Sequence, residues 1–242
     1  MSEVESRLWW YRSLHHLVAR ALTLHPKGHT ARIMDAGCGT GGLLMFLRNR
    51  GFAELSGFDV SADAVAICQE RGLPVEIGDL RSAHHALGRG GFDAIISNDT
   101  LYFFNSLEQQ QILRSFAEAL APDGLLIMNV PALRAFRGIH DMSVGISRRF
   151  TKPEVETLLS GVNLAPARIQ FWPFLLSPFI YFARFKQRIR LRYCAPLEVQ
   201  SDIDLPPAPL NRVLEGVTRF ENWVLPWKPF GSSLFVVTKK LC

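Results

Sequence analysis

The chain has 242 residues, of which 48% are hydrophobic and 20% are charged, and its formal net charge is +5. This composition supports one folded domain with a sizeable core and excludes a disordered chain. The positive charge is too small to require a nucleic-acid partner. The four cysteines lack the paired spacing of a zinc site, and the first residues lack the pattern of a signal peptide. We therefore expect reduced thiols and a cytoplasmic location.

The order of predicted elements indicates the fold class. An amphipathic helix is expected over residues 4–24, and helices over 41–50, 61–72, 106–120 and 151–159, the last two opening with capping boxes at Ser106–Gln109 and Thr151–Glu154. Strands are expected at 32–35, 55–59, 74–77, 92–97, 125–130, 168–172 and 234–237. This alternation predicts an α/β fold, with a doubly wound, mostly parallel, seven-stranded sheet and helices on both faces.

A glycine-rich turn follows the first predicted strand and precedes a helix. Such a turn lets the backbone approach a nucleotide-like ligand, and the helix start offers free N–H groups. Two ligand classes fit the spacing. Gly37, Gly39 and Gly42 satisfy the dinucleotide pattern G-x-G-x-x-G, whereas Asp35, Gly37, Gly39 and Gly41 satisfy D-x-G-x-G-x-G.

Further motifs separate the two classes. Asp59 ends the second strand, where a carboxylate can accept both hydroxyls of a ribose, and this suits either class. Asp79 after the third strand, the segment 120–126 (LAPDGLL) and the D-x-G-x-G-x-G turn together resemble the class I S-adenosylmethionine (SAM) dependent methyltransferases. The flanking segments 8–12, 140–151 and 210–215 resemble a ubiquinone/menaquinone-type branch of small-molecule enzymes.

The resemblance implies SAM as cofactor, S-adenosylhomocysteine as product, and no metal. It also implies an antiparallel last strand at the sheet edge. It assigns the ribose to Asp59 and the adenine amino group to Asp79, and Asn98-Asp99 at the fourth strand end is expected to face the ligand crevice. The predicted cofactor-binding residues are Tyr11, Asp35, Gly37, Gly39, Gly41, Asp59, Val60, Asp79, Leu80 and Asn98.

His140 is the predicted general base, because a histidine on the rim beyond the fifth strand can take a proton near neutral pH. Asp141 is predicted to orient it. The fourth strand ends in Ser97–Thr100 and lacks the N-P-P-aromatic pattern of many N-methyltransferases, so oxygen is the preferred atom of methylation. The acceptor is expected to be small and apolar or lipid-like.

The segment between the last two strands spans roughly 60 residues, too long for a simple loop, and it predicts a cap over the site. The expected division is an N-terminal helical cap (1–30), a SAM-binding Rossmann-like core (31–174), a cap insertion for the acceptor (175–231) and a final core strand (232–242). Residues 171–192 combine an aromatic run with a basic stripe, which suggests peripheral membrane contact. The apolar run is shorter than the ~20 residues of a membrane span.

Two alternatives stay open from the sequence. One is an NAD(P)-dependent oxidoreductase using the G-x-G-x-x-G match. The other is a SAM-fold module that binds RNA or protein, although no recognisable RNA-binding pattern is present and no nucleic acid is expected. The oligomeric state is not indicated by the sequence.

Overall fold

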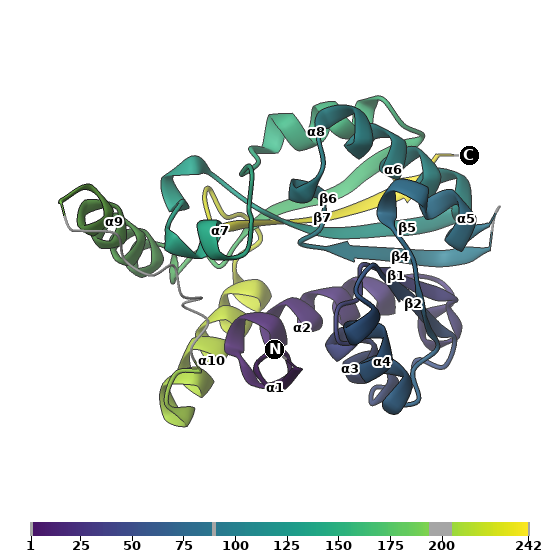
Figure 1. Ribbon diagram of the computed structural model, residues 1–242, viewed down its shortest axis with the longest axis horizontal. Helices are drawn as coiled ribbons and strands as arrows, with labels where there is room; N and C mark the ends of the chain where they lie inside the picture. The colour runs from purple at the N-terminus through teal and green to yellow at the C-terminus, as the bar shows by residue number, and fades with distance from the viewer. Residues whose placement is uncertain (1, 89–90, 194–204, 242) are drawn as a thin grey trace.

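A computed structural model describes residues 2–88, 91–193 and 205–241 (Figure 1). The strands are β1 (Ile33–Ala36), β2 (Leu55–Asp59), β3 (Val75–Ile77), β4 (Phe92–Asn98), β5 (Leu120–Pro131), β6 (Leu164–Trp172) and β7 (Ser233–Lys240). The α-helices are α1 (Ser2–Arg7), α2 (Trp9–Thr23), α3 (Gly42–Arg48), α4 (Ala62–Glu70), α5 (Ala83–Leu87), α6 (Ser106–Ala119), α7 (Ile139–Ser143), α8 (Lys152–Ser160), α9 (Ser177–Tyr193) and α10 (Ala208–Val224). Short 3₁₀ turns are η1 (Gly28–Thr30), η2 (Leu80–Ser82), η3 (Leu101–Phe103) and η4 (Arg134–Phe136).

The seven strands form one sheet in the order β3-β2-β1-β4-β5-β7-β6. The first five strands of this order are parallel, and β7 runs antiparallel to both β5 and β6. The predicted fold class is therefore confirmed. The expected edge position of the last strand is wrong, because β6 lies outside β7. The burial of Leu234, Phe235 and Val236 suits an interior strand, whereas much of β6 is exposed, as an edge strand tolerates.

Helices cover both faces of the sheet (Figure 1). On one face, α2, α3 and α4 bury their apolar sides in a core that also contains Ile96 and Ile127. On the other, α5, α6 and α8 pack over a core that contains Ile95 and Met128. Consecutive strand residues thus point to opposite cores, as the pleat requires.

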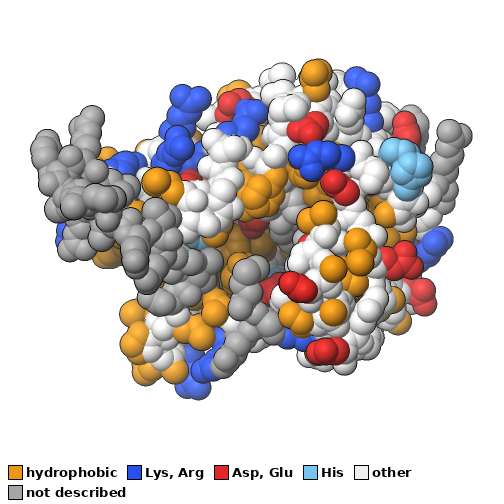
Figure 2. Space-filling view, in the orientation of Figure 1, with side chains coloured by type: hydrophobic (Ala, Val, Ile, Leu, Met, Phe, Trp, Pro, Cys, Tyr) orange, Lys and Arg blue, Asp and Glu red, His pale blue; other side chains and the backbone are white. Residues whose placement is uncertain are grey.

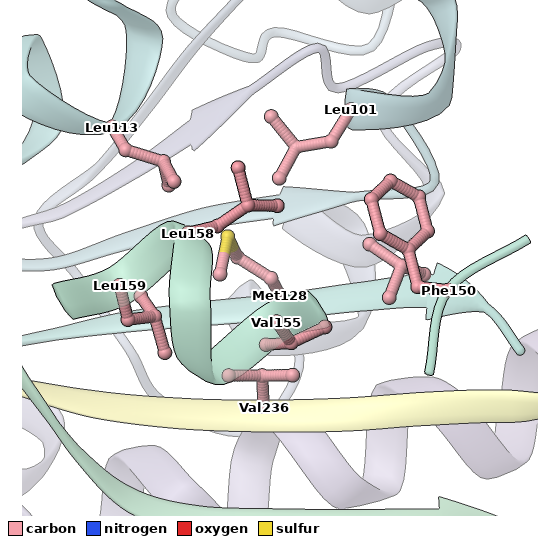
Figure 3. Close-up of a pocket in the computed structure, with 9 residues that line it drawn as sticks. Leu101, Leu113, Met128, Phe150, Val155, Leu158, Leu159 and Val236 are labelled. Carbon is pink, nitrogen blue, oxygen red and sulfur yellow. The ribbon is translucent and has the colours of Figure 1, made fainter. Parts of the chain in front are cut away.

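An apolar pocket within the second core lies between α6, α8 and the neighbouring strands (Figure 3). Leu113, Met128, Val155 and Leu158 are among its lining side chains, and all of the lining residues are hydrophobic. With no polar group to orient a ligand, it is a packing gap of the core rather than a binding site.

Some element boundaries differ from the prediction. The N-terminal helix is divided in two at Leu8. The helix expected to start at Ser106–Gln109 is capped one residue earlier: Asn105 Oδ1 accepts from the Glu108 backbone N–H at 3.1 Å, and Glu108 Oε2 accepts from the Asn105 N–H at 2.8 Å. Gln109 is buried instead and donates to the Leu101 carbonyl oxygen. The Thr151–Glu154 capping box is confirmed.

The long segment before β7 contains α9 and α10, which lie at the same end of the molecule (Figure 1). Helix α9 packs on η4 and α7, and α10 packs on α2. None of the helices among the described residues combines the length and the apolar character that crossing a bilayer requires. The division into caps and core stays a prediction.

Candidate functional site

The glycine-rich turn connects β1 to α3 in the conformation that its sequence favours. Gly37, Gly39 and Gly41 have φ values of +84°, +55° and +78°, in the left-handed region that glycine tolerates. A Cβ on Gly37 would lie 2.6 Å from Thr100 Cγ2, whereas a Cβ on Gly39 would meet no atom within 4 Å. The turn is therefore tightly packed at its base and has open space over Gly39.

Asp59, at the end of β2, is bonded directly to this turn. Its Oδ2 accepts the Gly39 N–H at 2.8 Å and its Oδ1 accepts the Ser61 N–H at 2.9 Å. A carboxylate offers about four acceptor positions, so each oxygen retains capacity for another donor. The neighbouring Val60 is 70% exposed. Asp59 is thus fixed beside the open space with its oxygens able to accept ligand hydroxyls.

Three carboxylates gather around the turn. Asp35 is buried at the end of β1, and burial, followed by the charges of Glu5 and Asp59, raises its pKa to about 8. Glu5 comes from α1 and accepts the Thr40 hydroxyl at 2.5 Å. Burial also raises the pKa of Glu5. Such a concentration of acids favours a positively charged ligand, because a cation would stabilise the ionised forms.

Asp99, directly after β4, belongs to a second polar group. Its backbone has φ +54°, and Asn129 Nδ2 donates to its two carboxylate oxygens at 3.0 and 3.1 Å. Asn129 Oδ1 in turn accepts from Trp172 Nε1 at 2.8 Å. Burial raises the pKa of Asp99 to about 7, and burial and then the Asp99 charge raise the pKa of Tyr11. The structure therefore brings Tyr11 and Asp99 together at the carboxyl ends of the strands.

The other predicted cofactor residues lie along the same edge. The buried amide oxygen of Asn98 has no hydrogen-bond partner among the described residues. Asp79 follows β3, and its Oδ1 accepts the Arg81 N–H at 2.9 Å. Leu80 is buried in the core cluster. Any ligand contact at Leu80 would thus involve its backbone rather than its side chain.

His140 and Asp141 lie on α7, beyond β5. His140 is half-buried. Arg149 holds the Asp141 carboxylate in a bidentate ion pair, with Nε to Oδ1 at 2.6 Å and Nη2 to Oδ2 at 3.0 Å. Asp141 Oδ2 also accepts the Gly138 N–H at 3.0 Å. These contacts give Asp141 a structural role at the start of α7, while its predicted catalytic role remains a prediction.

Glu5, Asn129 and Trp172 contribute to the site but were not selected from the sequence. The sequence around Glu5 predicts only an amphipathic helix. Asn129 and Trp172 lie near or at the ends of strands whose sequences predict only core packing. Trp172 also stacks on Trp10 of α2, with ring centroids 5.2 Å apart. No sequence spacing joins these residues, because α2, β5 and β6 meet only in the folded chain.

The residues fit an adenosyl cation. Open space adjoins Gly39, Asp59 has free acceptor capacity, the Asn98 oxygen lacks a partner among the described residues, and three acids lie around the turn. Figure 2 shows a hollow near the middle of the visible face, with hydrophobic and acidic side chains in and around it. Asp35, Gly39, Asp59 and Asn98 are the residues that would hold the adenosyl and methionyl parts.

Comparisons with known proteins agree with this geometry. Residues 33–124 match a methyltransferase-domain family. A trans-aconitate 2-methyltransferase of Mycobacterium sp. (strain KMS) is 36% identical over 101 residues, which cover 41% of this chain and 38% of that enzyme. A malonyl-[acyl-carrier protein] O-methyltransferase of Enterobacter lignolyticus is 28% identical over 159 residues, covering 63% of this chain and 60% of that enzyme. The chain therefore matches less than two thirds of the length of either relative.

Solved structures share the fold across nearly the whole chain. A SAM-dependent methyltransferase from Archaeoglobus fulgidus superimposes with a TM-score of 0.60 at 16% identity, covering 93% of this chain and 94% of that one. A second from Mesorhizobium loti has a TM-score of 0.59 at 16% identity, with 93% and 96% covered. Residues 33–124 are thus similar to a methyltransferase domain, and the chain as a whole shares the fold of these SAM-dependent methyltransferases.

Proposed function

We propose that the protein transfers the methyl group of SAM to an oxygen atom of a small, apolar or lipid-like acceptor. The observation that carries the proposal is the Asp59 carboxylate, which is bonded to the Gly39 N–H beside open space at the tips of β1 and β2. SAM, when bound, supplies an electrophilic methyl group on a sulfonium cation. The chain's own task is to fix the two reactants in line and to keep water away.

The acidic residues support a cationic ligand at this edge. Asp35 and Asp59 lie on neighbouring strands, and Glu5 approaches from α1. Ionised Asp35 is disfavoured in the free protein because it is buried next to two other acids. A cation placed among the three carboxylates offsets their mutual repulsion, which gives the site a preference for the positively charged SAM.

Aromatic residues support an apolar acceptor. Trp10 stacks on Trp172, and Phe174 meets Phe230 with ring centroids 4.9 Å apart. Trp172 itself donates to Asn129, which is bonded to Asp99, and Phe174 follows Trp172 by two residues. The Enterobacter relative is an O-methyltransferase by name, which agrees with transfer to oxygen. Membership in a quinone-type branch remains a prediction.

A ligand panel tests the cofactor. We expect SAM and S-adenosylhomocysteine to raise the melting temperature and to bind in calorimetry, and NAD(H) and NADP(H) to do neither. Binding at 100 times Kd adds about 2.7 kcal/mol of stability, which shifts the melting temperature by several degrees. Stabilisation by a nicotinamide cofactor alone would contradict the proposal and favour the oxidoreductase alternative.

Two residues are candidates for the base that deprotonates the acceptor. His140 is the candidate from the sequence, and the structure adds Asp99, whose carboxylate Asn129 fixes at the end of β4. Once an acceptor is found, both His140→Ala and Asp99→Asn are measured. The substitution that removes the base is expected to lower kcat about 10²–10⁴-fold and to leave the affinity for S-adenosylhomocysteine unchanged.

The loss of the pH dependence in one variant distinguishes the two bases. Burial raises the pKa of Asp99 to about 7, so turnover that depends on ionised Asp99 rises with pH through about 7, and this rise disappears in Asp99→Asn. Ser143→Ala, on the same short helix as His140, serves as the control and should keep normal turnover. Normal turnover in both base variants would show that neither residue takes the proton.

A further inference from the structure

Helix α10 presents its polar face to the protein. Glu215 and Glu221 are 7% and 0% exposed, although both are charged residues. Glu215 pairs with Arg12 of α2 at 2.8 Å. Glu221 accepts the backbone N–H groups of Phe174 at 2.9 Å and Leu175 at 2.7 Å. The buried acids of α10 are thus paired within the chain, although Glu215 Oε1 accepts no hydrogen bond among the described residues.

Further hydrogen bonds attach this polar face to α2 and to the end of α1. Asn211 Oδ1 accepts the Trp9 N–H at 2.9 Å, and its Nδ2 donates to the Arg7 carbonyl oxygen at 2.8 Å. Arg20 donates to the Asn222 carbonyl oxygen at 2.8 Å. These directional contacts fix the rotation of α10 about its axis, so its opposite face must point outward.

That outward face is apolar. The exposed side chains are Leu210 (50%), Val213 (59%), Phe220 (56%), Trp223 (79%) and Val224 (43%), followed after the helix by Trp227 (75%). Figure 2 shows hydrophobic side chains gathered at the lower left, where Figure 1 places α10, next to basic ones. A helix normally buries its apolar face against the core. Large exposed apolar patches mark surfaces that another body covers.

Helix α9 has the same character at the same end of the molecule. Phe179 (75%), Phe182 (61%), Phe185 (43%) and Ile189 (43%) are exposed at helical spacing. Residues 177–193 contain five Lys or Arg residues and no Asp or Glu. Of these, Lys186 is exposed within the described residues.

Charge selects between the possible partners. Arg212 and Arg219 are exposed on α10, beside its apolar face, while both acids of the helix point inward. Pairing with a second copy would bring these basic residues of two chains together without exposed acids from either helix. An anionic lipid surface offers both an apolar layer for the aromatic side chains and negative charge for the basic ones.

We infer that α9 and α10 form a surface that lies on an anionic membrane, with Trp223 and Trp227 in the interfacial layer. The sequence suggested membrane contact only through residues 171–192, and α10 is the addition from the structure. Tryptophan suits this position, because its ring is apolar and its N–H can remain in contact with water. The inference does not depend on methyl transfer.

Sedimentation of the full chain with vesicles tests the inference. We expect the chain to bind vesicles of phosphatidylcholine with about 30 mol% phosphatidylglycerol. It should bind little to vesicles of phosphatidylcholine alone, or to the anionic vesicles in high salt. The double variant Trp223→Ser/Trp227→Ser should bind about tenfold more weakly. Arg212→Gln should bind about fivefold more weakly, since one basic residue near an anionic surface contributes about that factor.

The matched control is Leu107→Ser on α6, because Leu107 is 73% exposed but lies outside both helices. It should bind vesicles as the unchanged chain does. Absence of binding to anionic vesicles, or equal binding by the double tryptophan variant, would overturn the inference. A dimer in solution that the same double variant dissociates would assign the surface to self-association instead. Calorimetry with S-adenosylhomocysteine on each preparation reports the cofactor site separately.

Discussion

Replacing Asp59 with alanine is expected to abolish measurable binding of S-adenosylhomocysteine. The carboxylate is positioned to accept the ribose hydroxyls, and hydrogen bonds to a charged group contribute about 1.5–3 kcal/mol each. Loss of two such bonds corresponds to at least about 100-fold in Kd. Asp59 also holds the Gly39 and Ser61 N–H groups, so the turn itself loses a support. Isothermal titration calorimetry measures the change.

Two further variants separate these contributions. Asp59→Asn keeps an acceptor oxygen but removes the charge and one acceptor, so it should bind with intermediate affinity. Asp63→Ala removes an exposed carboxylate from the first turn of α4 and should keep full affinity. A melting temperature recorded for each variant establishes that it is folded. Unchanged affinity in Asp59→Ala would refute the assignment of the ribose to this residue.

Replacing Asp141 with alanine is expected to cause the largest loss of stability. The Asp141–Arg149 pair is almost fully enclosed, with side chains 1% and 7% exposed. Arg149 also donates to the carbonyl oxygens of Ala132 and Ser232, so it links the end of β5 to the chain that enters β7. Removing one partner of a buried ion pair costs about 3–5 kcal/mol, because the other charge is left uncompensated. That loss lowers the melting temperature by about 6–20 °C.

The exposed pair Lys152–Glu156 provides the comparison. Its atoms are 3.9 Å apart and its side chains are about half exposed. Surface pairs contribute about 0–1 kcal/mol, so Glu156→Ala should leave the melting temperature within a few degrees. If Asp141→Ala instead melted normally but lost turnover, the carboxylate would be a catalytic group, as the sequence suggested, rather than a structural one.

The succession of strands and helices along the chain and the glycine turn could be predicted because their causes are local. Residues 33–42 contain the strand, the positive-φ glycines and the helix start in one continuous segment. Asp59 was recognisable for the same reason, since it directly ends a strand whose neighbour carries the turn. In these places, sequence position alone determines spatial position.

The remaining parts of the site depend on contacts between distant segments. Glu5 reaches Thr40 across 35 positions, and Asn129 joins Asp99 to Trp172. The inward position of Glu221 contradicts the usual expectation for a charged residue. The backbone N–H groups of residues 174 and 175 and the buried ammonium group of Lys228, 3.9 Å away, explain it. The position of β6 outside β7 likewise results from strand pairing, which no local pattern encodes.

The first two helices contact two separate parts of the molecule. Glu5 of α1 is bonded to Thr40 in the glycine turn, and four residues later the Trp9 N–H of α2 is bonded to Asn211 of α10. Because α1 and α2 are joined at Leu8, one short segment contacts both the glycine turn and the helix that carries Trp223. The N-terminal segment is therefore a direct structural connection between the glycine turn and the exposed apolar surface of α10.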